Sequence, residues 1–479
     1  MESAGQTYHR LTAYRHDRHW LVPEDDERVV STFLALDDRR YPAEFKSYPD
    51  DLPRVALPAD LPPGSAGGPL DLAELSRLVY FSVGVVRYRE RADGRPIHFR
   101  AAPSAGNRHP IELYVCARDV DGLDDGVWHY SPRDHALVRI GPAPECAVPA
   151  LVLTGVPWRT CWKYAERGYR HVWWDAGAVV AQLHALAAQR GDRLHVSLGF
   201  ADREVARLVG ADLEHELPLA VVSIGRFQPA PVAAGDAATG DLGPVPVTFP
   251  LVGRTHQAGV LRTSDSAGNW AQRSARTSPR RHRDGAEPVE DVIVRRGSTR
   301  RFDANATVKL DVLRATMLAA GDVPDWDCGA WPLTTHVVAN AVDDLTPGVY
   351  RWLDGEPRLV AADGDPRAQA RVLCEGQDLA HDSAFLVLQS ALIAPFLLRR
   401  GERGYRVLQF AAGVAAGGLY LSAFAQELGC TGLTITDTTV PDVLRSPADG
   451  LLAVAVGVPA YRARRGASRP GSPARLREL

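Results

Sequence analysis

Two long, mainly apolar stretches stand out in the pattern of hydrophobic and polar positions along the chain. They run from Tyr169 to Ala188 and from Val407 to Gln426, and their length and alanine content predict helices. Each follows the same five residues, Glu-Arg-Gly-Tyr-Arg, at 166–170 and at 402–406. Because the same five residues precede the same kind of segment twice, 236 residues apart, we infer an internal duplication.

Shorter patterns around these helices repeat in the same order. Leucines at helical spacing between Leu70 and Leu78 predict a helix, and runs of apolar or β-branched residues predict strands. The predicted strands of the first half are Ile111 to Val115, Gly126 to Tyr130, Ala150 to Thr154 and Leu219 to Ile224. In the second half, Leu310 and Leu313 match Leu72 and Leu75, and residues 348–350 match residues 126–128. The strand predicted at residues 452–456 matches the closing strand of the first half. Strands interleaved with helices, twice over, predict two α+β or α/β units that form a pseudo-dimer with an approximate two-fold axis.

Shifts in composition divide the chain into five segments. Residues 228–289 are rich in Pro, Gly, Ala, Ser and Arg and are interpreted as a linker that contains one strand at Val245 to Leu251. The predicted segments are an extended arm at 1–65, the first unit at 66–227, the linker at 228–289, the second unit at 290–465 and a tail at 466–479.

Composition narrows the class of protein. A chain of 479 residues exceeds one hydrophobic core, and a net charge of −3 gives no reason to expect nucleic acid or an anionic membrane as a partner. The segment from Val407 to Gln426 is rich in Ala and Gly, which favours a buried interface helix over a membrane span. Six scattered cysteines without metal-ligand spacing, and no secretory signal, predict free thiols in a reducing cytoplasm.

Lysine is rare, since only Lys46, Lys163 and Lys309 occur among 55 basic residues. Lysine can lose its proton at an attainable pH, whereas arginine cannot. We therefore favour a functional role for Lys163, which precedes Tyr164 in front of the first repeat.

A cluster of arginines opens the second unit at 295–302, Arg-Arg-Gly-Ser-Thr-Arg-Arg-Phe. Guanidinium groups bond pairs of phosphate oxygens, and the hydroxyls of Ser298 and Thr299 suit the remaining acceptors. A helical segment that starts just upstream is expected to add backbone donors. The plainer interpretation is a solvated basic run, which we assign to the neighbouring residues 280–283.

A second candidate is the turn at 103–110, Pro-Ser-Ala-Gly-Asn-Arg-His-Pro, directly before a predicted strand. Such a turn lets the backbone approach a flat ligand, although an ordinary surface turn has the same composition. At the matching position in the second half, 325–330, the turn is missing, and the first half has no arginine near 57–64. This complementary loss predicts one complete site, with the turn from the first half and the arginines from the second.

These residues resemble the FMN-dependent nitroreductase fold. The turn at 103–106, Leu113 to Val115, and Lys163-Tyr164 with Arg167 and Tyr169-Arg170 resemble, more narrowly, the SagB-type azoline dehydrogenases, over about residues 66–227 and 290–465. The resemblance implies two α+β domains, each an antiparallel-rich sheet wrapped by helices, fused as an intrachain pseudo-dimer. It implies FMN-dependent oxidation of thiazolines and oxazolines to thiazoles and oxazoles in a ribosomally made precursor peptide. Those enzymes usually work as homodimers or with partner enzymes, so a cyclodehydratase partner is expected, and this chain is expected to be monomeric or to dimerise further.

The resemblance also assigns residues by position. The FMN phosphate is expected at Arg295, Arg296, Ser298 and Arg300, joined by Arg462 and Arg464; the isoalloxazine ring at Pro103, Ser104, Gly106 and Asn107; and backbone donors at Thr431, Gly432 and Leu433. Lys163 and Tyr164 are the expected catalytic pair. Azoline oxidation sends a hydride to the flavin and a proton to a base, and the sequence leaves open which of the two takes the proton.

Three alternatives share the flavin site. They are an NAD(P)H-dependent nitro- or quinone reductase, a non-catalytic flavin-binding protein, and a flavoenzyme that oxidises another peptide bond type. The isolated histidines His129, His171 and His195 lack metal-ligand spacing, and salt bridges are expected for Asp175 and Glu166. No winged-helix module for a leader peptide is evident before residue 65.

Overall fold

A computed structural model of the chain describes residues 2–16, 41–61, 68–91, 94–243, 246–272 and 287–476. The first half forms an eight-stranded sheet in the order β1-β6-β5-β4-β7-β9-β8-β11. Its strands are β1 Arg54–Ala56, β4 Ile111–Ala117, β5 Gly126–Ser131, β6 Ala136–Gly141, β7 Ala150–Gly155, β8 Leu194–Ser197, β9 Leu217–Ile224 and β11 Asp325–Trp326. Its helices are α3 Leu72–Val83, η3 Ala105–Asn107, α4 Pro157–Tyr164, η4 Ala165–Arg167, α5 Gly168–Arg190 and α6 Asp202–Val209.

The second half forms a six-stranded sheet in the order β15-β14-β12-β16-β18-β17, with every neighbouring pair antiparallel. Its strands are β12 Thr334–Ala339, β14 Gly348–Leu353, β15 Glu356–Ala361, β16 Phe385–Ala391, β17 Gly429–Leu433 and β18 Asp449–Gly457. Its helices are α10 Leu310–Ala320, α11 Pro366–Leu373, α12 Asp378–Asp382, α13 Ile393–Arg400, α14 Gly404–Ala425, η5 Asp437–Thr439 and α15 Val440–Leu444. Smaller elements are α1 Ala4–Leu11, β2 Val85–Glu90, β3 Pro96–Arg100, α7 Pro250–Ala258, α8 Ser264–Trp270, α9 Val289–Arg295, β10 Val308–Lys309, β13 Val342–Asp343 and β19 Ala474–Arg475.

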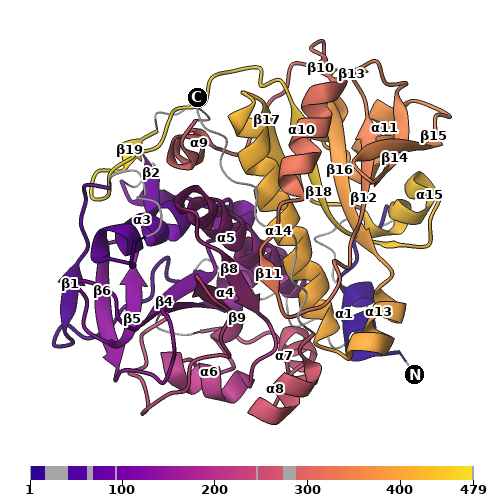
Figure 1. Cartoon of the computed structure of the whole chain (residues 1–479). Coiled ribbons are helices and arrows are strands. Elements are labelled where there is room, and N and C mark those ends of the chain that lie inside the picture. The colour runs from indigo at the N-terminus through magenta and orange to yellow at the C-terminus, as the bar shows by residue number, and fades with distance from the viewer. Residues whose placement is uncertain are drawn as a thin grey trace.

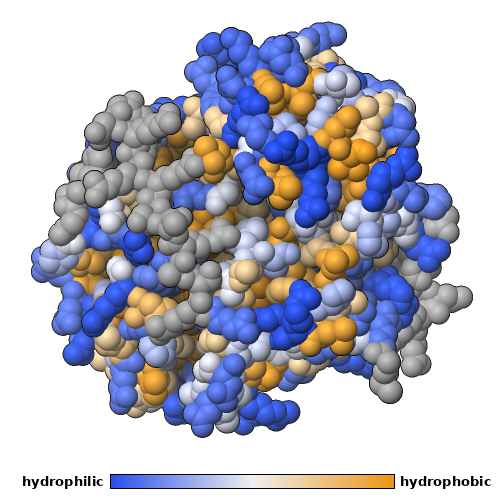
Figure 2. Space-filling view, turned by 45° about the vertical axis from the view of Figure 1, so that its right-hand side comes forward, coloured by the Kyte–Doolittle hydropathy of each residue, from blue (hydrophilic) through white to orange (hydrophobic). Residues whose placement is uncertain are grey.

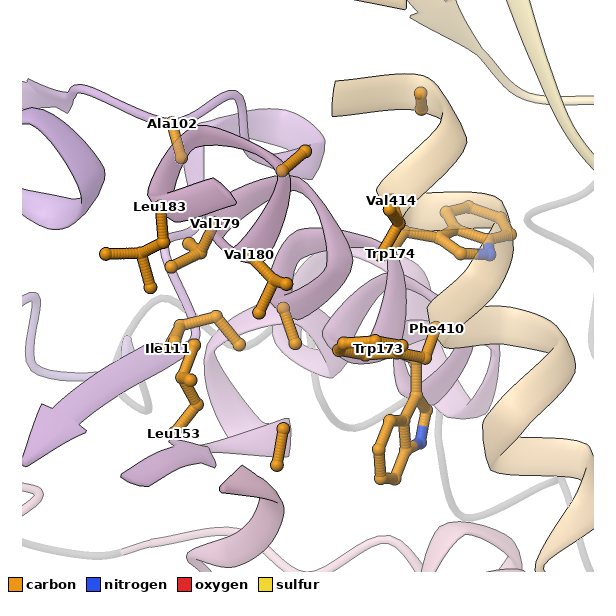
Figure 3. Packing of buried hydrophobic residues seen from close by; sticks show 14 of the residues in the cluster. Ala102, Ile111, Leu153, Trp173, Trp174, Val179, Val180, Leu183, Phe410 and Val414 are labelled. Atoms are coloured by element: carbon orange, nitrogen blue, oxygen red, sulfur yellow. The ribbon is translucent and has the colours of Figure 1, made fainter. Parts of the chain in front are cut away.

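The two predicted long helices, α5 and α14, lie side by side at the centre of the molecule (Figure 1). They approach closely because a glycine faces the contact from each side. A Cβ atom on Gly177 would lie 2.4 Å from the Phe410 carbonyl oxygen, and one on Gly413 would lie 2.3 Å from the Trp174 carbonyl oxygen. Figure 3 shows Trp173 and Trp174 of α5 beside Phe410 and Val414 of α14. These contacts join the cores of the two halves.

Two segments of the second half also pair with strands of the first half. β11 of the second half pairs in parallel with β8 of the first, through Asp325 opposite His195 and Trp326 opposite Val196. β19, near the end of the chain, pairs in parallel with β2 of the first half, and Figure 1 shows this terminal segment crossing to that side. The halves are therefore interlocked through backbone pairing as well as through packing.

The repeated Glu-Arg-Gly-Tyr-Arg motif has a structural explanation. Arg167 and Arg170 of the first half donate at 2.6 and 2.7 Å to Asp437 of the second half, whose side chain is only 7% exposed. Arg403 and Arg406 of the second half donate in the same way to the buried Asp202 of the first, at 2.5 and 2.7 Å. The arginines lower the pKa of each aspartate, despite burial, so both carboxylates remain ionised. The motif thus forms reciprocal ion pairs across the pseudo-two-fold axis.

Each glutamate of the motif anchors a short helix that lies outside the two sheet-forming units. Glu402 accepts a hydrogen bond from the Gly5 amide in α1, and Glu166 accepts from the amides of Leu251 and Val252 in α7. Helix α1 lies in the predicted arm and α7 in the predicted linker, so these two helices occupy equivalent places. The arm is therefore not simply extended. The strand predicted at Val245 to Leu251 is wrong, because α7 begins at Pro250 and residues 246–249 form no strand; residues 244 and 245 lie outside the described part.

Other predictions hold. The α+β fold with two related, helix-flanked sheets is confirmed, and α14 is the one described helix long and apolar enough to span a bilayer, with 89% of its apolar window buried inside the protein. The face in Figure 2 carries hydrophobic residues in separate patches among hydrophilic ones. All six cysteines are free.

Candidate active site between the halves

The turn at 103–110 has an unusual backbone. Gly106, Asn107 and His109 all have positive φ angles, of 59°, 58° and 45°. Two of these three residues are not glycine, which is uncommon outside functional or strongly supported turns. The Asn107 side chain donates to the His98 carbonyl oxygen and faces the His109 ring at 2.9 Å, so it folds back onto the turn.

Asp175 in α5 fixes the turn through hydrogen bonds. Its carboxylate accepts a hydrogen bond from the Ser104 hydroxyl and one of 3.1 Å from the Ala105 amide. Burial raises the pKa of Asp175 to about 7. The salt bridge predicted for Asp175 is wrong for the described residues, and so is that for Glu166, because both carboxylates bind backbone amides instead. The side chains of Ser104 and Asn107 therefore shape the turn, and Gly106 presents its backbone.

Lys163 and Tyr164, at the end of α4, face Gly106. A Cβ atom on Gly106 would lie 2.6 Å from the Tyr164 hydroxyl and 3.0 Å from Lys163 Nζ, so only glycine leaves room for the pair. Lys163 is exposed, yet partial desolvation and the charges of Arg108 and Arg300 lower the pKa of its ammonium. Burial raises the pKa of Tyr164, and Tyr14 and Asp175 add to the rise. The two groups are thus shifted in opposite directions, toward neutral amine and neutral phenol.

The arginine cluster divides into anchors and free cations. Arg295 pairs with Glu287 and donates to the Phe424 carbonyl oxygen, and the buried Arg296 donates to the Ala101 carbonyl oxygen at 2.6 Å, two residues before the turn. Arg296 therefore joins the cluster to the turn of the other half, and both guanidinium groups hold neighbouring parts of the protein. Helix α9 ends at Arg295, so its carbonyl end faces the cluster; the expectation that an upstream helix adds amide donors is wrong.

Tyr420 in α14 connects Ser298 to β17. Its hydroxyl lies 3.2 Å from the Ser298 hydroxyl and accepts a hydrogen bond of 2.8 Å from the Gly432 amide. The Cys430 amide donates to the Thr299 hydroxyl at 2.9 Å. The outward amides of β17 are therefore engaged by the cluster, while Thr431 and Leu433 pair with β18.

Arg300 is exposed and lies close enough to Lys163 to shift its pKa, although the two belong to different halves. Arg108 joins them, held by the Tyr41 hydroxyl and lying over the rings of Tyr41 and Trp162. Besides desolvation, two arginines thus lower the pKa of Lys163, and no carboxylate is among the causes. The exposed Arg462 and Arg464 follow β18, and the Arg464 carbonyl accepts from Arg87, which also binds the carbonyls of Val294 and Arg296. A donor set of this charge fits an anionic group such as the phosphate of FMN.

At the second-half position equivalent to the turn and the Lys163-Tyr164 pair, the space is occupied by other side chains. Residues 325–330 contain β11 in place of the turn, and Asp327 accepts hydrogen bonds from the amides of Leu198 and Gly199. Arg400, the counterpart of Tyr164, lies under the Trp270 ring at 4.2 Å, and Trp270 Nε1 donates to its carbonyl oxygen. Trp270 belongs to α8, in the predicted linker. Protein side chains therefore occupy the second position.

Several residues of the site escaped sequence reasoning. Asp175 and Tyr420 are polar residues inside apolar helices, and this was the available signal. Arg108 stands in the turn but was not singled out. Nothing in the sequence indicated the contacts of Arg87, Tyr14 or Tyr41, because each lies in a segment distant from its partners.

Comparison with known proteins identifies the family. The nitroreductase family model matches residues 69–226 and 293–458. The chain belongs to the nitroreductase family. The two matches correspond to the two halves, and membership supports FMN as the cofactor. One relative, a predicted nitroreductase of Methanocaldococcus jannaschii, is 32% identical over 174 residues, which are 33% of this chain and 82% of the relative.

Two further likenesses extend this result. Trifolitoxin-processing protein TfxF of Rhizobium leguminosarum bv. trifolii is 30% identical over 115 residues, 24% of this chain, and the match spans 42% of that protein's length. The crystal structure of a predicted nitroreductase from Anabaena variabilis superposes with a TM-score of 0.77 at 24% identity, over 96% of this chain and all of that one. This shows that the whole two-unit fold occurs in another protein.

Proposed function

We propose that the protein is an FMN-dependent azoline dehydrogenase, which oxidises thiazoline or oxazoline rings in a ribosomally made peptide to thiazoles or oxazoles. The observation that carries the proposal is the contact of Lys163 and Tyr164 with Gly106, beside Arg300 of the other half. Similarity to a trifolitoxin-processing protein supports a role in peptide modification. The proposed partners are a precursor peptide and a cyclodehydratase that forms the rings.

We assign the FMN phosphate to Ser298 and Arg300, with Arg462 and Arg464 from the segment after β18. The isoalloxazine ring is assigned to the backbone of the turn at Gly106, between Pro103 and Asn107. Arg295 and Arg296 are reassigned as anchors, because their guanidinium groups bind Glu287 and Ala101. Ser104 acts through Asp175, and Thr431 to Leu433 act through the bond of the Gly432 amide to Tyr420. When bound, FMN supplies the two-electron acceptor that the oxidation requires.

The pKa shifts favour Lys163 over Tyr164 as the base. A base must be unprotonated before it can take a proton, and desolvation with the nearby arginines makes the neutral amine of Lys163 more accessible. The raised pKa of Tyr164 keeps its phenol protonated at neutral pH. Lys163 then accepts the ring proton, and the Tyr164 hydroxyl orients the ring as a hydrogen-bond donor.

A direct assay tests the proposal. Protein reconstituted with FMN is incubated with a synthetic thiazoline-containing peptide and an artificial electron acceptor, and mass spectrometry measures the loss of two hydrogens. The rate should rise with pH through a pKa below about 10.4, the ordinary lysine value, because the neutral amine reacts. Lys163→Arg should abolish the reaction, since arginine restores the charge but keeps its proton. Rapid NAD(P)H-dependent nitro reduction with an unimpaired Lys163→Arg variant would contradict the proposal and favour a general reductase.

A further inference from the structure

A cleft of about 700 Å³ lies in the first half, away from the residues assigned to FMN. It is bounded by the start of α4, by α6, by the loop before β9 and by α7, and Figure 1 shows α6, α7 and α8 together below β9. Its floor is apolar and buried, with Trp158, Leu217, Phe249 and Val252. Its rim is polar and includes Arg203, Asp212, Glu214, His215, Gln257 and Arg262. A cleft of this size with an apolar floor and a few polar rim groups has the general character of a binding site.

Two cations stand at one end of this cleft. The Asp202 amide donates to the Leu261 carbonyl and the Asp202 carboxylate accepts from the Leu261 amide, both at 3.0 Å, so the adjacent Arg203 and Arg262 lie near each other. Both arginines are exposed, and within the described ranges neither forms a hydrogen bond or an ion pair. The nearby Asp202 cannot neutralise them, because Arg403 and Arg406 already bind it. Two unpaired guanidinium groups favour a carboxylate from outside.

One carboxylate of the rim, Asp212, is satisfied by its own loop. The Asp212 carboxylate accepts hydrogen bonds from the amides of Glu214, His215 and Glu216, and it lies 2.7 Å from the His215 ring nitrogen. The His215 bond and these amides lower the pKa of Asp212 despite its partial burial. Asp212 therefore holds its own loop in shape, while the exposed Glu214 carboxylate on the same rim and the two arginines are left to face solvent.

The cleft also connects to the proposed catalytic pair. Helix α4 begins in the cleft at Pro157 and ends at Tyr164, so one short helix carries both Trp158 of the floor and Lys163. Glu166 follows and fixes the start of α7, the opposite wall, through the amides of Leu251 and Val252. A ligand in the cleft would thus lie against the same helix that positions the pair.

We propose that this cleft binds an acidic and apolar stretch of the peptide substrate, outside the ring that reacts. An apolar side chain would cover Trp158 and Phe249, while a glutamate or aspartate would bond Arg203 and Arg262. The identity of the occupant as the substrate peptide rests on the proposed function. The chemistry of the cleft, an apolar floor with two free guanidinium groups, does not.

Gly253 provides a way to block the cleft. It lines the cleft on α7, has no positive φ, and a Cβ atom there would have no neighbour within 4 Å. Gly253→Trp should therefore fill the cleft without disturbing the helix. Gly268 on α8 is equally open and does not line the cleft, so Gly268→Trp is the matched control.

The test measures binding of a fluorescein-labelled, end-capped hexapeptide, Glu-Leu-Glu-Phe-Leu-Glu, to the full chain by fluorescence anisotropy. Gly253→Trp and the double variant Arg203→Glu/Arg262→Glu should each weaken binding at least about tenfold, as should replacing the peptide's glutamates by glutamine. Gly268→Trp should bind like the unaltered protein, and circular dichroism should show all variants folded.

Unchanged binding in folded Gly253→Trp, equal binding of the glutamine peptide, or displacement of the peptide by decanoate at equal affinity would overturn the inference. The assay requires no turnover. If the protein fails to oxidise thiazolines but Gly253→Trp still loses the hexapeptide, the proposed function fails and the cleft assignment stands. If the protein oxidises thiazolines normally and Gly253→Trp has no effect on peptide binding, the proposed function stands and the cleft assignment fails.

Discussion

The two halves share their framework but differ at the two positions where a nitroreductase-type site can form. In both, two arginines of the repeated motif cross to an aspartate of the other half, and a glutamate fixes a short helix. Only the first position combines the Gly106 turn, Lys163 and Arg300. At the second, Trp270 covers Arg400 and Asp327 binds the backbone of β8's following loop. Duplicated sequence thus preserves what holds the halves together, while the residues proposed for the chemistry occur at one place only.

The sharpest test of this difference compares Lys163→Ala with Arg399→Ala. Arg399 is the counterpart of Lys163, is exposed, and forms no hydrogen bond or ion pair within the described residues. Loss of a positioned base should reduce azoline oxidation by about 10²–10⁴-fold in Lys163→Ala, with bound flavin retained, whereas Arg399→Ala should leave the rate within twofold or so. Steady-state rates and flavin absorbance measure both. Equal losses in the two variants would remove the distinction between the positions.

The shared framework predicts equal effects from Asp437→Asn and Asp202→Asn. Each change leaves two buried arginines without their carboxylate, so each should lower the free energy of unfolding by about 3–5 kcal/mol. Because both aspartates have lowered pKa values, their contribution is present above about pH 4 and is lost as the pH falls further. Urea unfolding at pH 7 and at a pH below 4 measures this. A large loss of unfolding free energy in only one of the two variants would show that the two sets of ion pairs do not stabilise the protein equally.

The helix contact gives a smaller matched pair. Gly177→Ala and Gly413→Ala each place a Cβ atom within 2.4 Å of the backbone of the opposite helix, so each should cost about 1–3 kcal/mol. Gly268→Ala, in open space on α8, should be neutral or slightly stabilising. Melting temperatures of the three variants rank these effects, and an unaltered Gly177→Ala protein would show that the helices separate without cost.

Asp175 should make the stability of the first half depend on pH. The second half has no such group, because Ala411 stands at the equivalent position. The folded pKa of Asp175, about 7, exceeds the ordinary value of about 3.9, so the folded protein keeps this proton longer and loses stability as the pH rises between these values. Asp175→Asn should remove that slope, which is at most about 1.4 kcal/mol per pH unit. Unfolding measured from pH 4 to 8 checks it, and an unchanged slope would assign the dependence to other groups.

Sequence reasoning selected residues that the structure places together where a residue type carries its own chemical argument. The scarcity of lysine pointed to Lys163. The composition of the Ser-Ala-Gly-Asn turn pointed to Gly106, which the structure places against that lysine. It failed where function depends on partners far apart in sequence. Asp175 was interpreted as an ion-pair residue because its contact with Ser104 spans 71 residues. Helix α7 was interpreted as linker because its equivalence to α1 survives in contacts to Glu166 and Glu402 rather than in identical residues.

The most direct test of the single composite site is the amount of flavin per chain. Purified protein saturated with FMN and freed of excess cofactor should bind one FMN per polypeptide, and Arg300→Ala or Ser298→Ala should lower that occupancy while Trp270→Ala should not raise it. Two flavins per chain, or none in a folded preparation supplied with FMN, would contradict the account.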